Sequence, residues 1–253
     1  MSQYNVLQAI GMSFYSKKLY RDVATNWGGK AFAYLLLLVA LASTFITYEV
    51  QITLNQFYRN YSARLFNQIP VITVENGKLK TPEKRPYVIV EPESNNPIAI
   101  IDTSGQYTNL DNTKAAILVT EDQIITHNKN ETKIVKFSET INGTLDPEVI
   151  NTTIGKFVGY SWIILFIVIV LFSYVYRIIQ ALIYSLFGKL FASIGKYDLS
   201  YGQIMQIALV SITPVIVVGT ILDFFIIHFP LQWLGYFILA MSYLFYGITA
   251  NKK

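Results

Sequence analysis

Four long apolar runs constrain the fold of this chain more than any other feature. Phe157–Tyr176 holds 20 residues without a charged side chain, and a helix of that length covers about 30 Å, the thickness of a bilayer's hydrocarbon core. Hydrophobic residues make up 53% of the chain and charged residues 14%, and the mean hydropathy is +0.39. These values are atypical of soluble proteins and predict an α-helical integral membrane protein with four transmembrane helices. The predicted membrane helices are residues 31–49, 157–177, 204–228 and 231–249.

A more polar segment, residues 50–156, separates the first predicted membrane helix from the second. It contains 11 Lys and Arg against 12 Asp and Glu, and its short runs rich in Val and Ile are typical of strands. Asn76-Gly77 stands between two such runs and predicts a hairpin. We therefore expect a mainly-β domain inserted between the first two membrane helices.

Three further segments complete the predicted organisation. In residues 1–30, Leu7, Ile10 and Phe14 recur at three- and four-residue steps beside several basic residues, which predicts an amphipathic helix in the membrane interface. A solvated N-terminal helix is the alternative. The apolar pattern continues through residues 178–203, which we expect to form a cytoplasmic elbow helix and loop, and residues 250–253 form a short tail.

The distribution of basic residues predicts the orientation. The N-terminus, the 177–203 connection and the C-terminus hold Lys or Arg, with only Asp22 and Asp198 as acids among them. The long 50–156 segment can be translocated whatever its charge, because the positive-inside rule applies to short loops. We therefore expect both termini in the cytoplasm and residues 50–156 outside it.

Two charged residues interrupt the apolar segments. Arg177 falls at the predicted inner end of the second membrane helix, where its guanidinium can reach lipid headgroups as an interfacial anchor. Asp223 falls near the predicted outer end of the third, inside GTILDFFIIHF. A charged group at membrane depth is a candidate functional residue. In this arrangement most of the bilayer separates the two side chains, so we expect them not to pair.

Two polar residues are candidate partners of Asp223. Lys156 and His228 are both expected at the outer boundary, and a bond from Asp223 to either one, or to a backbone group, would be structural. The alternative for Asp223 is a role in handling protons or lipid headgroups. Thr213-Pro214 predicts a kink at Pro214 in the third membrane helix, because proline removes a backbone donor.

The residues favour neither catalysis nor metal binding. The chain has no cysteine, and its two histidines, His127 and His228, are far apart in the sequence. Asp223 and His228 would point about 140° apart on a regular helix, and the spacing of Ser193 and Lys196 is too short a pattern to indicate a dyad. We predict no catalytic residues, no cofactor, no metal site and, without a basic stripe interleaved with aromatics, no nucleic-acid partner.

Two stretches carry a resemblance to a known family. FYSKKLYRDVATNWGGKAFAYLLLL and YRIIQALIYSLFGKLFASIGKYDLSYGQIMQIALVSITPV resemble a bacterial inner-membrane family filed as a domain of unknown function, some members of which are named maltodextrin-utilisation protein. The second stretch is also similar, more weakly, to the membrane core of Yip-type proteins, which act through binding. The resemblance implies a location in the bacterial cytoplasmic membrane.

These features lead to three functional hypotheses. The first is a non-enzymatic accessory or binding subunit of a larger envelope complex, such as a transporter or lipid-transfer machine, with protein partners and membrane lipids around it. The second is a small carrier or lipid-handling protein that uses Asp223 and the kinked third membrane helix. An intramembrane hydrolase is the weakest alternative.

Overall fold

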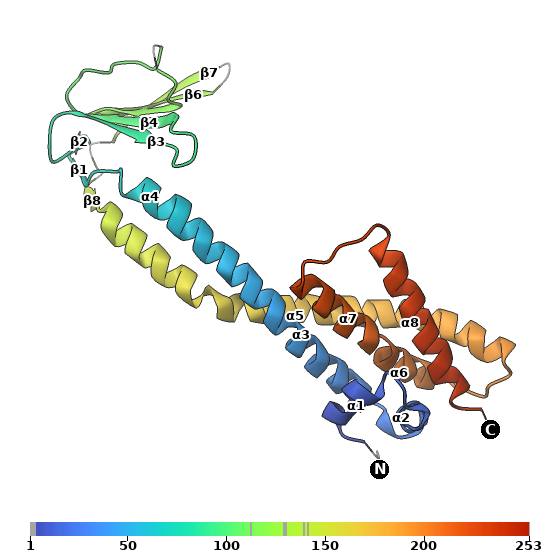
Figure 1. The fold of residues 1–253 in the computed structure, drawn as a ribbon. Coiled ribbons are helices and arrows are strands. Elements are labelled where there is room, and N and C mark those ends of the chain that lie inside the picture. Colours follow the sequence, from blue (N-terminus) through green and yellow to red (C-terminus); the bar gives the residue numbers. More distant parts are fainter. Residues whose placement is uncertain (1–3, 112, 129–130, 139, 141, 253) are drawn as a thin grey trace. The chain divides into compact units, whose positions relative to one another are not determined.

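A computed structural model describes residues 4–111, 113–128, 131–138, 140 and 142–252. The chain forms two compact units. We call Met1–Val50 together with Trp162–Lys253 the helical unit, and Gln51–Ser161 the β unit. Figure 1 shows the elements of both units. Residues 1–3 of the predicted N-terminal helix and Lys253 of the predicted tail lie outside the described residues.

Most of the chain is helical. The helices are α1 (Val6–Met12), α2 (Lys17–Asp22), the π-helix η1 (Val23–Trp27), α3 (Lys30–Phe57), the π-helix η2 (Tyr58–Ser62), α4 (Ala63–Phe66), α5 (Pro147–Ile194), α6 (Tyr201–Ser211), α7 (Thr213–Phe224) and α8 (Gln232–Thr249).

The N-terminal segment differs from the single helix predicted over residues 1–30. Asn5 and Gln8 form a capping box at the start of α1, and the Ser16 side chain accepts a hydrogen bond from Leu19 N to start α2 as a separate helix. Polar caps of this kind satisfy backbone N–H groups that a new helix leaves without partners. Gly28, with φ +46°, follows η1 and allows the turn into α3.

Three helical segments are long and apolar enough to cross a membrane, namely Lys30–Phe66, Pro147–Ile194 and Tyr201–Phe224. The helix α8, which occupies the predicted fourth membrane helix 231–249, is not among them, so the count of four remains a prediction. The helix α3 also runs past the predicted end of the first membrane helix at residue 49.

The helix α5 joins two segments that were predicted to be separate. It continues without a break through the expected boundary between 157–177 and 178–203. No Gly or Pro occurs between Ser161 and Phe187, so nothing in the sequence stops the helix there. Its 48 residues give a length of about 72 Å, more than twice the hydrocarbon thickness of a bilayer. Arg177 therefore lies inside a continuous helix rather than at the end of one.

The third apolar run is divided in two. The helix α6 ends at Ser211 and α7 begins at Thr213, with Pro214 in its first turn. Proline is favoured in the first turn of a helix, where its missing N–H is not needed.

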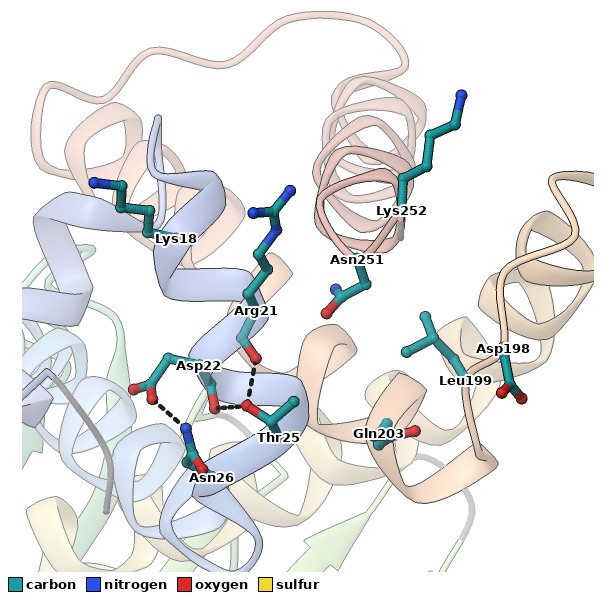
Figure 2. Close-up of a pocket in the computed structure, with 10 residues that line it drawn as sticks. All are labelled: Lys18, Arg21, Asp22, Thr25, Asn26, Asp198, Leu199, Gln203, Asn251 and Lys252. Carbon is teal, nitrogen blue, oxygen red and sulfur yellow. Dashed lines mark hydrogen bonds between the residues drawn. The ribbon is translucent and has the colours of Figure 1, made fainter.

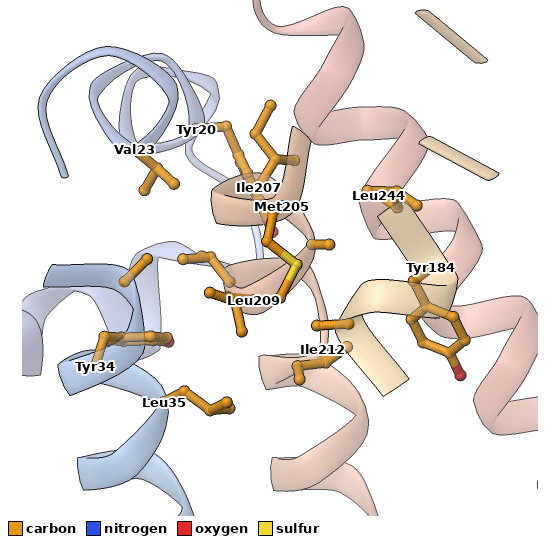
Figure 3. Close-up of a cluster of buried hydrophobic side chains, with 14 of the residues drawn as sticks. Tyr20, Val23, Tyr34, Leu35, Tyr184, Met205, Ile207, Leu209, Ile212 and Leu244 are labelled. Carbon is orange, nitrogen blue, oxygen red and sulfur yellow. The ribbon is translucent and has the colours of Figure 1, made fainter. Parts of the chain in front are cut away.

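The core of the helical unit surrounds α6 (Figure 3). Ile207, Leu209 and Ile212 are fully buried there, against side chains such as Tyr34 and Leu244 from α3 and α8. The helix α6 is apolar on nearly every face, which is typical of a central helix.

The β unit contains two sheets. Their strands are β1 (Ile72–Glu75), β2 (Lys78–Lys80), β3 (Pro86–Val90), β4 (Pro97–Asp102), β5 (Ile117–Val119), β6 (Gln123–Asn128), β7 (Glu131–Lys136) and β8 (Gly143–Leu145). The orders are β2-β1-β8 and β3-β4-β5-β6-β7, and among the described strands only β4 and β5 pair in parallel. The predicted hairpin is present between β1 and β2, where Asn76 and Gly77 both have positive φ.

The ends of α3 and α5 that belong to the β unit are bonded to each other. Gln51 Nε2 donates to the Val158 carbonyl at 2.7 Å, and Ser161 Oγ donates to Gln51 Oε1 at 3.0 Å. Tyr58 donates to the Asn151 carbonyl at 2.8 Å. These bonds connect the end of α3 and the following π-helix η2 to α5 within the β unit.

Candidate functional site

The helical unit contains a small cavity of about 150 Å³ between α3, α5, α7 and α8. Its apolar walls include Val39, Ala42, Ile216 and Gly219. Its polar lining residues are Ser43, Ser173, Tyr176, Arg177, Thr220, Asp223 and Tyr236. We call this the Arg–Asp cavity. It places two opposite charges around one space, and three of the four surrounding helices (α3, α5 and α7) belong to segments long and apolar enough to cross a membrane.

Arg177 belongs to a row of polar side chains on one face of α5, which we call the α5 ladder. Ser173, Arg177, Gln180 and Tyr184 follow one another at steps of four, three and four residues, which puts them on one face of the helix. Arg177 Nη1 donates to Gln180 Oε1 at 2.7 Å, and Gln180 Nε2 donates to the Tyr184 hydroxyl at 2.8 Å. The guanidinium is half-buried and lies 5.4 Å from the centre of the Tyr176 ring. These contacts fix the position of the positive charge.

Asp223 supplies the negative charge from the other side. It is the second-last residue of α7, and its side chain is exposed at that end of the helix. The C-terminal end of a helix carries a partial negative charge, so Asp223 adds to a region that already attracts cations. Among the described residues, no ion pair within 4 Å joins Asp223 to Arg177.

The expectation that most of the bilayer separates Arg177 from Asp223 is wrong, because both line the same cavity. That expectation assumed that the second membrane helix ends at residue 177, so that Arg177 would lie at the inner interface. Because α5 continues to Ile194, the position of Arg177 is set by its packing among α3, α7 and α8.

The two residues predicted as partners of Asp223 lie elsewhere. His228 is exposed in the loop after α7, and its Nδ1 is 3.3 Å from the Ile226 carbonyl oxygen. Lys156 belongs to the part of α5 in the β unit. Neither residue lines the Arg–Asp cavity. Pro214 does not line it either, but the next two residues, Val215 and Ile216, do.

Comparison with known proteins gives the family. The model of a family described as "Protein of unknown function (DUF1189)" matches residues 7–248. The chain belongs to this family. An uncharacterized protein of Rickettsia prowazekii (strain Madrid E) is 28% identical over 165 residues, which cover 57% of each chain. The match thus spans little more than half of that relative. No solved structure matches, and the comparisons name no enzymatic family.

Several residues of the site in this DUF1189 protein were not singled out from the sequence. Gln180 and Tyr236 are examples, although Gln180 could have been found from the spacing of the α5 ladder. Ser43, Thr220 and Tyr236 are polar residues in largely apolar helices, and only tertiary packing brings them to the cavity.

A second, larger cavity of about 520 Å³ lies beside α2 and the end of α8 (Figure 2). Its basic lining residues are Lys18, Arg21 and Lys252. Arg21 Nε donates to the Ala250 carbonyl, and a cation at the C-terminal end of a helix is stabilising. Asn251 Nδ2 donates to the Gly247 carbonyl at 2.9 Å. These bonds give Arg21 and Asn251 structural roles in ending α8, so this cavity is the weaker candidate of the two.

The described residues contain no group of three His, Cys, Asp or Glu that could hold a metal ion. The chemistry of the Arg–Asp cavity is therefore that of one guanidinium, one carboxylate and several hydroxyl groups.

Proposed function

We propose that this protein is a non-enzymatic membrane protein that binds an ionised or amphiphilic ligand within the bilayer, as a lipid-handling protein or small carrier. The observation that carries the proposal is that Arg177 and Asp223 line one cavity among apolar helices. The cavity also provides hydroxyl groups from Ser43, Ser173 and Thr220, which can donate and accept hydrogen bonds.

The cost of burying charge supports a binding role. An Arg or Asp at the centre of a membrane helix costs about 2.5–3.5 kcal/mol on insertion scales, and such residues generally mark pathways or binding sites. This cost applies to Arg177, which lies within α5, whereas Asp223 is exposed near the end of α7. Among the described residues no ion pair joins Arg177 to Asp223, so the cost is not offset by direct pairing. A ligand that contacts both groups would offset it.

The proposal includes the predicted topology. It comprises four membrane helices in the bacterial cytoplasmic membrane, both termini in the cytoplasm and the β unit outside. The three apolar segments and the excess of Lys and Arg near both termini support this arrangement. A reporter fused after Lys253 that is active only outside the cytoplasm would overturn it.

The binding role is tested by purifying the full chain from bacterial membranes in mild detergent and measuring retained lipids by native mass spectrometry. Wild type is expected to retain lipid, and Arg177→Gln and Asp223→Asn are expected to retain much less. Lys189→Gln and Glu93→Gln are matched controls, because both residues are exposed and lie outside the cavity. Equal retention by wild type and both cavity variants would refute the proposal.

A second candidate, an accessory subunit of an envelope complex, has its own supporting observation. The edge strand β7 has every side chain exposed, including Ile134 at 56% and Val135 at 48%. An edge strand with exposed apolar side chains can pair with a strand of another protein. The test is co-purification after crosslinking: a stoichiometric partner in wild type that is lost in Ile134→Lys supports this candidate.

A further inference from the structure

We infer that the ligand of the Arg–Asp cavity is zwitterionic, with its anionic group at Arg177 and its cationic group at Asp223, and that it is the headgroup of a phospholipid such as phosphatidylethanolamine. This inference rests on the proposed binding function and specifies the ligand. The inference treats the two ends of the cavity separately, because Arg177 attracts an anionic group and Asp223 attracts a cationic group.

The Arg177 end is suited to a phosphate. The described residues account for one of the five N–H donors of the guanidinium, the one bonded to Gln180 Oε1. Because the α5 ladder already fixes the side chain, little conformational entropy is lost when the remaining donors bind a ligand. Guanidinium groups match the geometry of phosphate oxygens and bind them through two parallel hydrogen bonds.

The Asp223 end is suited to an ammonium group. The carboxylate lies at the C-terminal end of α7, so the partial negative charge of the helix end adds to the charge of the side chain. A purely anionic ligand would meet repulsion at this end, and a purely cationic ligand would meet repulsion at Arg177.

The surroundings favour a lipid over a free solute. The cavity, at about 150 Å³, has room for a polar group and not for acyl chains. An apolar groove of about 210 Å³ between α3 and α7 shares Ala42, Ile216 and Thr220 with the cavity, and its remaining lining is Ile10, Leu38, Leu41, Phe45, Val217 and Ile221. Apolar surface next to a charged cavity is the pattern that an amphiphile requires.

The predicted orientation is also consistent with a lipid of the outer leaflet. Asp223 lies at the end of α7 next to the loop that contains His228, and this end is predicted to face outward. Arg177 lies within α5, away from both ends of that helix. A headgroup with its ammonium group at Asp223 and its phosphate at Arg177 would direct its acyl chains away from the outer surface.

The experiment uses the full chain in nanodiscs that contain equal amounts of phosphatidylethanolamine and phosphatidylglycerol with the same acyl chains. The lipid that stays bound on release into the gas phase is counted by native mass spectrometry. Wild type is expected to retain phosphatidylethanolamine about tenfold over phosphatidylglycerol, which corresponds to about 1.4 kcal/mol. Asp223→Asn should abolish this preference, and Arg177→Gln should reduce retention of both lipids.

Two further variants distinguish a specific loss of lipid binding from a loss of folding. Asp223→Glu keeps the charge and should keep the preference. Gly219→Leu changes no charge but adds a side chain to the wall of the cavity, and it should reduce retention of both lipids. Each variant is accepted only if its unfolding midpoint in detergent is close to that of wild type.

The outcomes separate this inference from the proposed function. Retention of phosphatidylglycerol as strong as that of phosphatidylethanolamine, still sensitive to Arg177→Gln, would overturn the zwitterionic ligand and leave lipid binding intact. No retention of either lipid would overturn both. Free phosphoethanolamine that displaces the lipid at equal concentration would overturn the lipid source and support the zwitterionic chemistry.

Discussion

Tyr34 of α3 and Thr213 of α7 share a buried hydrogen bond of 2.7 Å between their hydroxyl oxygens. Thr213 is the first residue after the break between α6 and α7, so this bond ties α3 to the point where the apolar run is divided. Replacing Tyr34 with Phe leaves the Thr213 hydroxyl without this partner. We expect Tyr34→Phe to lower the free energy of unfolding by about 1–3 kcal/mol, measured by denaturation in detergent.

The double variant Tyr34→Phe with Thr213→Val is the control for this prediction. Removing both hydroxyl groups leaves neither partner of this hydrogen bond unpaired, so its loss of stability should be smaller than the sum of the two single losses. Strict additivity of the two effects would show that the bond contributes nothing.

Close packing at two glycines leads to a second prediction. A Cβ atom at Gly247 would lie 2.6 Å from Tyr20 Cδ1 and 2.7 Å from Ile207 Cγ2, and one at Gly188 would lie 2.6 Å from Ile204 Cγ2. Small residues allow membrane helices to approach closely. We expect Gly247→Ala and Gly188→Ala each to cost about 1–3 kcal/mol through overpacking, seen as lower unfolding midpoints in detergent.

Gly202 provides the matched control. It lies in the first turn of α6, where an added Cβ would meet no atom within 4 Å. Gly202→Ala should be neutral or slightly stabilising, because Ala is the better helix former. Equal destabilisation by all three substitutions would argue that helix contact is not the cause.

Much of the architecture could be predicted from hydrophobic length and turn chemistry. Apolar runs located α3, α5 and the α6–α7 pair, and Asn76-Gly77 located a hairpin. Both signals can be read from one short stretch of sequence. The length of an apolar run is compared with the thickness of the membrane, and a hairpin turn depends on the backbone conformations of two residues.

The proximity of Arg177 and Asp223 could not be predicted in this way. Hydropathy places a residue along the membrane normal only if each helix is straight and just long enough to cross. The helix α5 has no residue that ends it near Arg177, so that assumption failed. The separate helices α1 and α2 were missed for a different reason: the cap supplied by Ser16 competes with an apolar periodicity that runs across it.

Asp22 organises the end of α2 and leads to a third prediction. Its buried carboxylate accepts hydrogen bonds from Asn26 Nδ2 at 2.8 Å and Trp27 Nε1 at 2.9 Å. Asp22→Ala removes this acceptor from a buried indole N–H, which should cost about 1–3 kcal/mol. The expected readouts are a lower unfolding midpoint and a change in tryptophan fluorescence.

Trp27→Phe tests whether the indole bond is responsible. If it is, the losses caused by Asp22→Ala and Trp27→Phe should overlap in the double variant. Fluorescence from Trp27 that is unchanged in Asp22→Ala would contradict the proposed contact.

Asp102 in the β unit gives a prediction about pH. It is buried at the end of β4 and accepts hydrogen bonds from Ser104 N at 2.8 Å, Ser104 Oγ at 2.6 Å and Tyr107 N at 2.7 Å. Burial alone would raise the pKa of Asp102, but the bonds from Ser104 and Tyr107 outweigh it and hold the pKa below its usual value. In the unfolded chain the pKa returns to about 3.9.

Because folding lowers the pKa of Asp102, this residue stabilises the folded state more at high pH than at low pH. The contribution of Asp102 to stability is complete above the unfolded pKa and disappears as the pH falls through the folded pKa. Asp102→Asn removes the charged acceptor at every pH. At pH 7 the variant should therefore exchange the amide hydrogens of residues 102–107 faster than wild type, and the difference should shrink below about pH 4. Hydrogen exchange of both proteins at matched pH, followed by mass spectrometry, measures this directly. A difference that stays constant from pH 7 to pH 3 would mean that Asp102 shapes this turn without its charge, as a neutral acceptor.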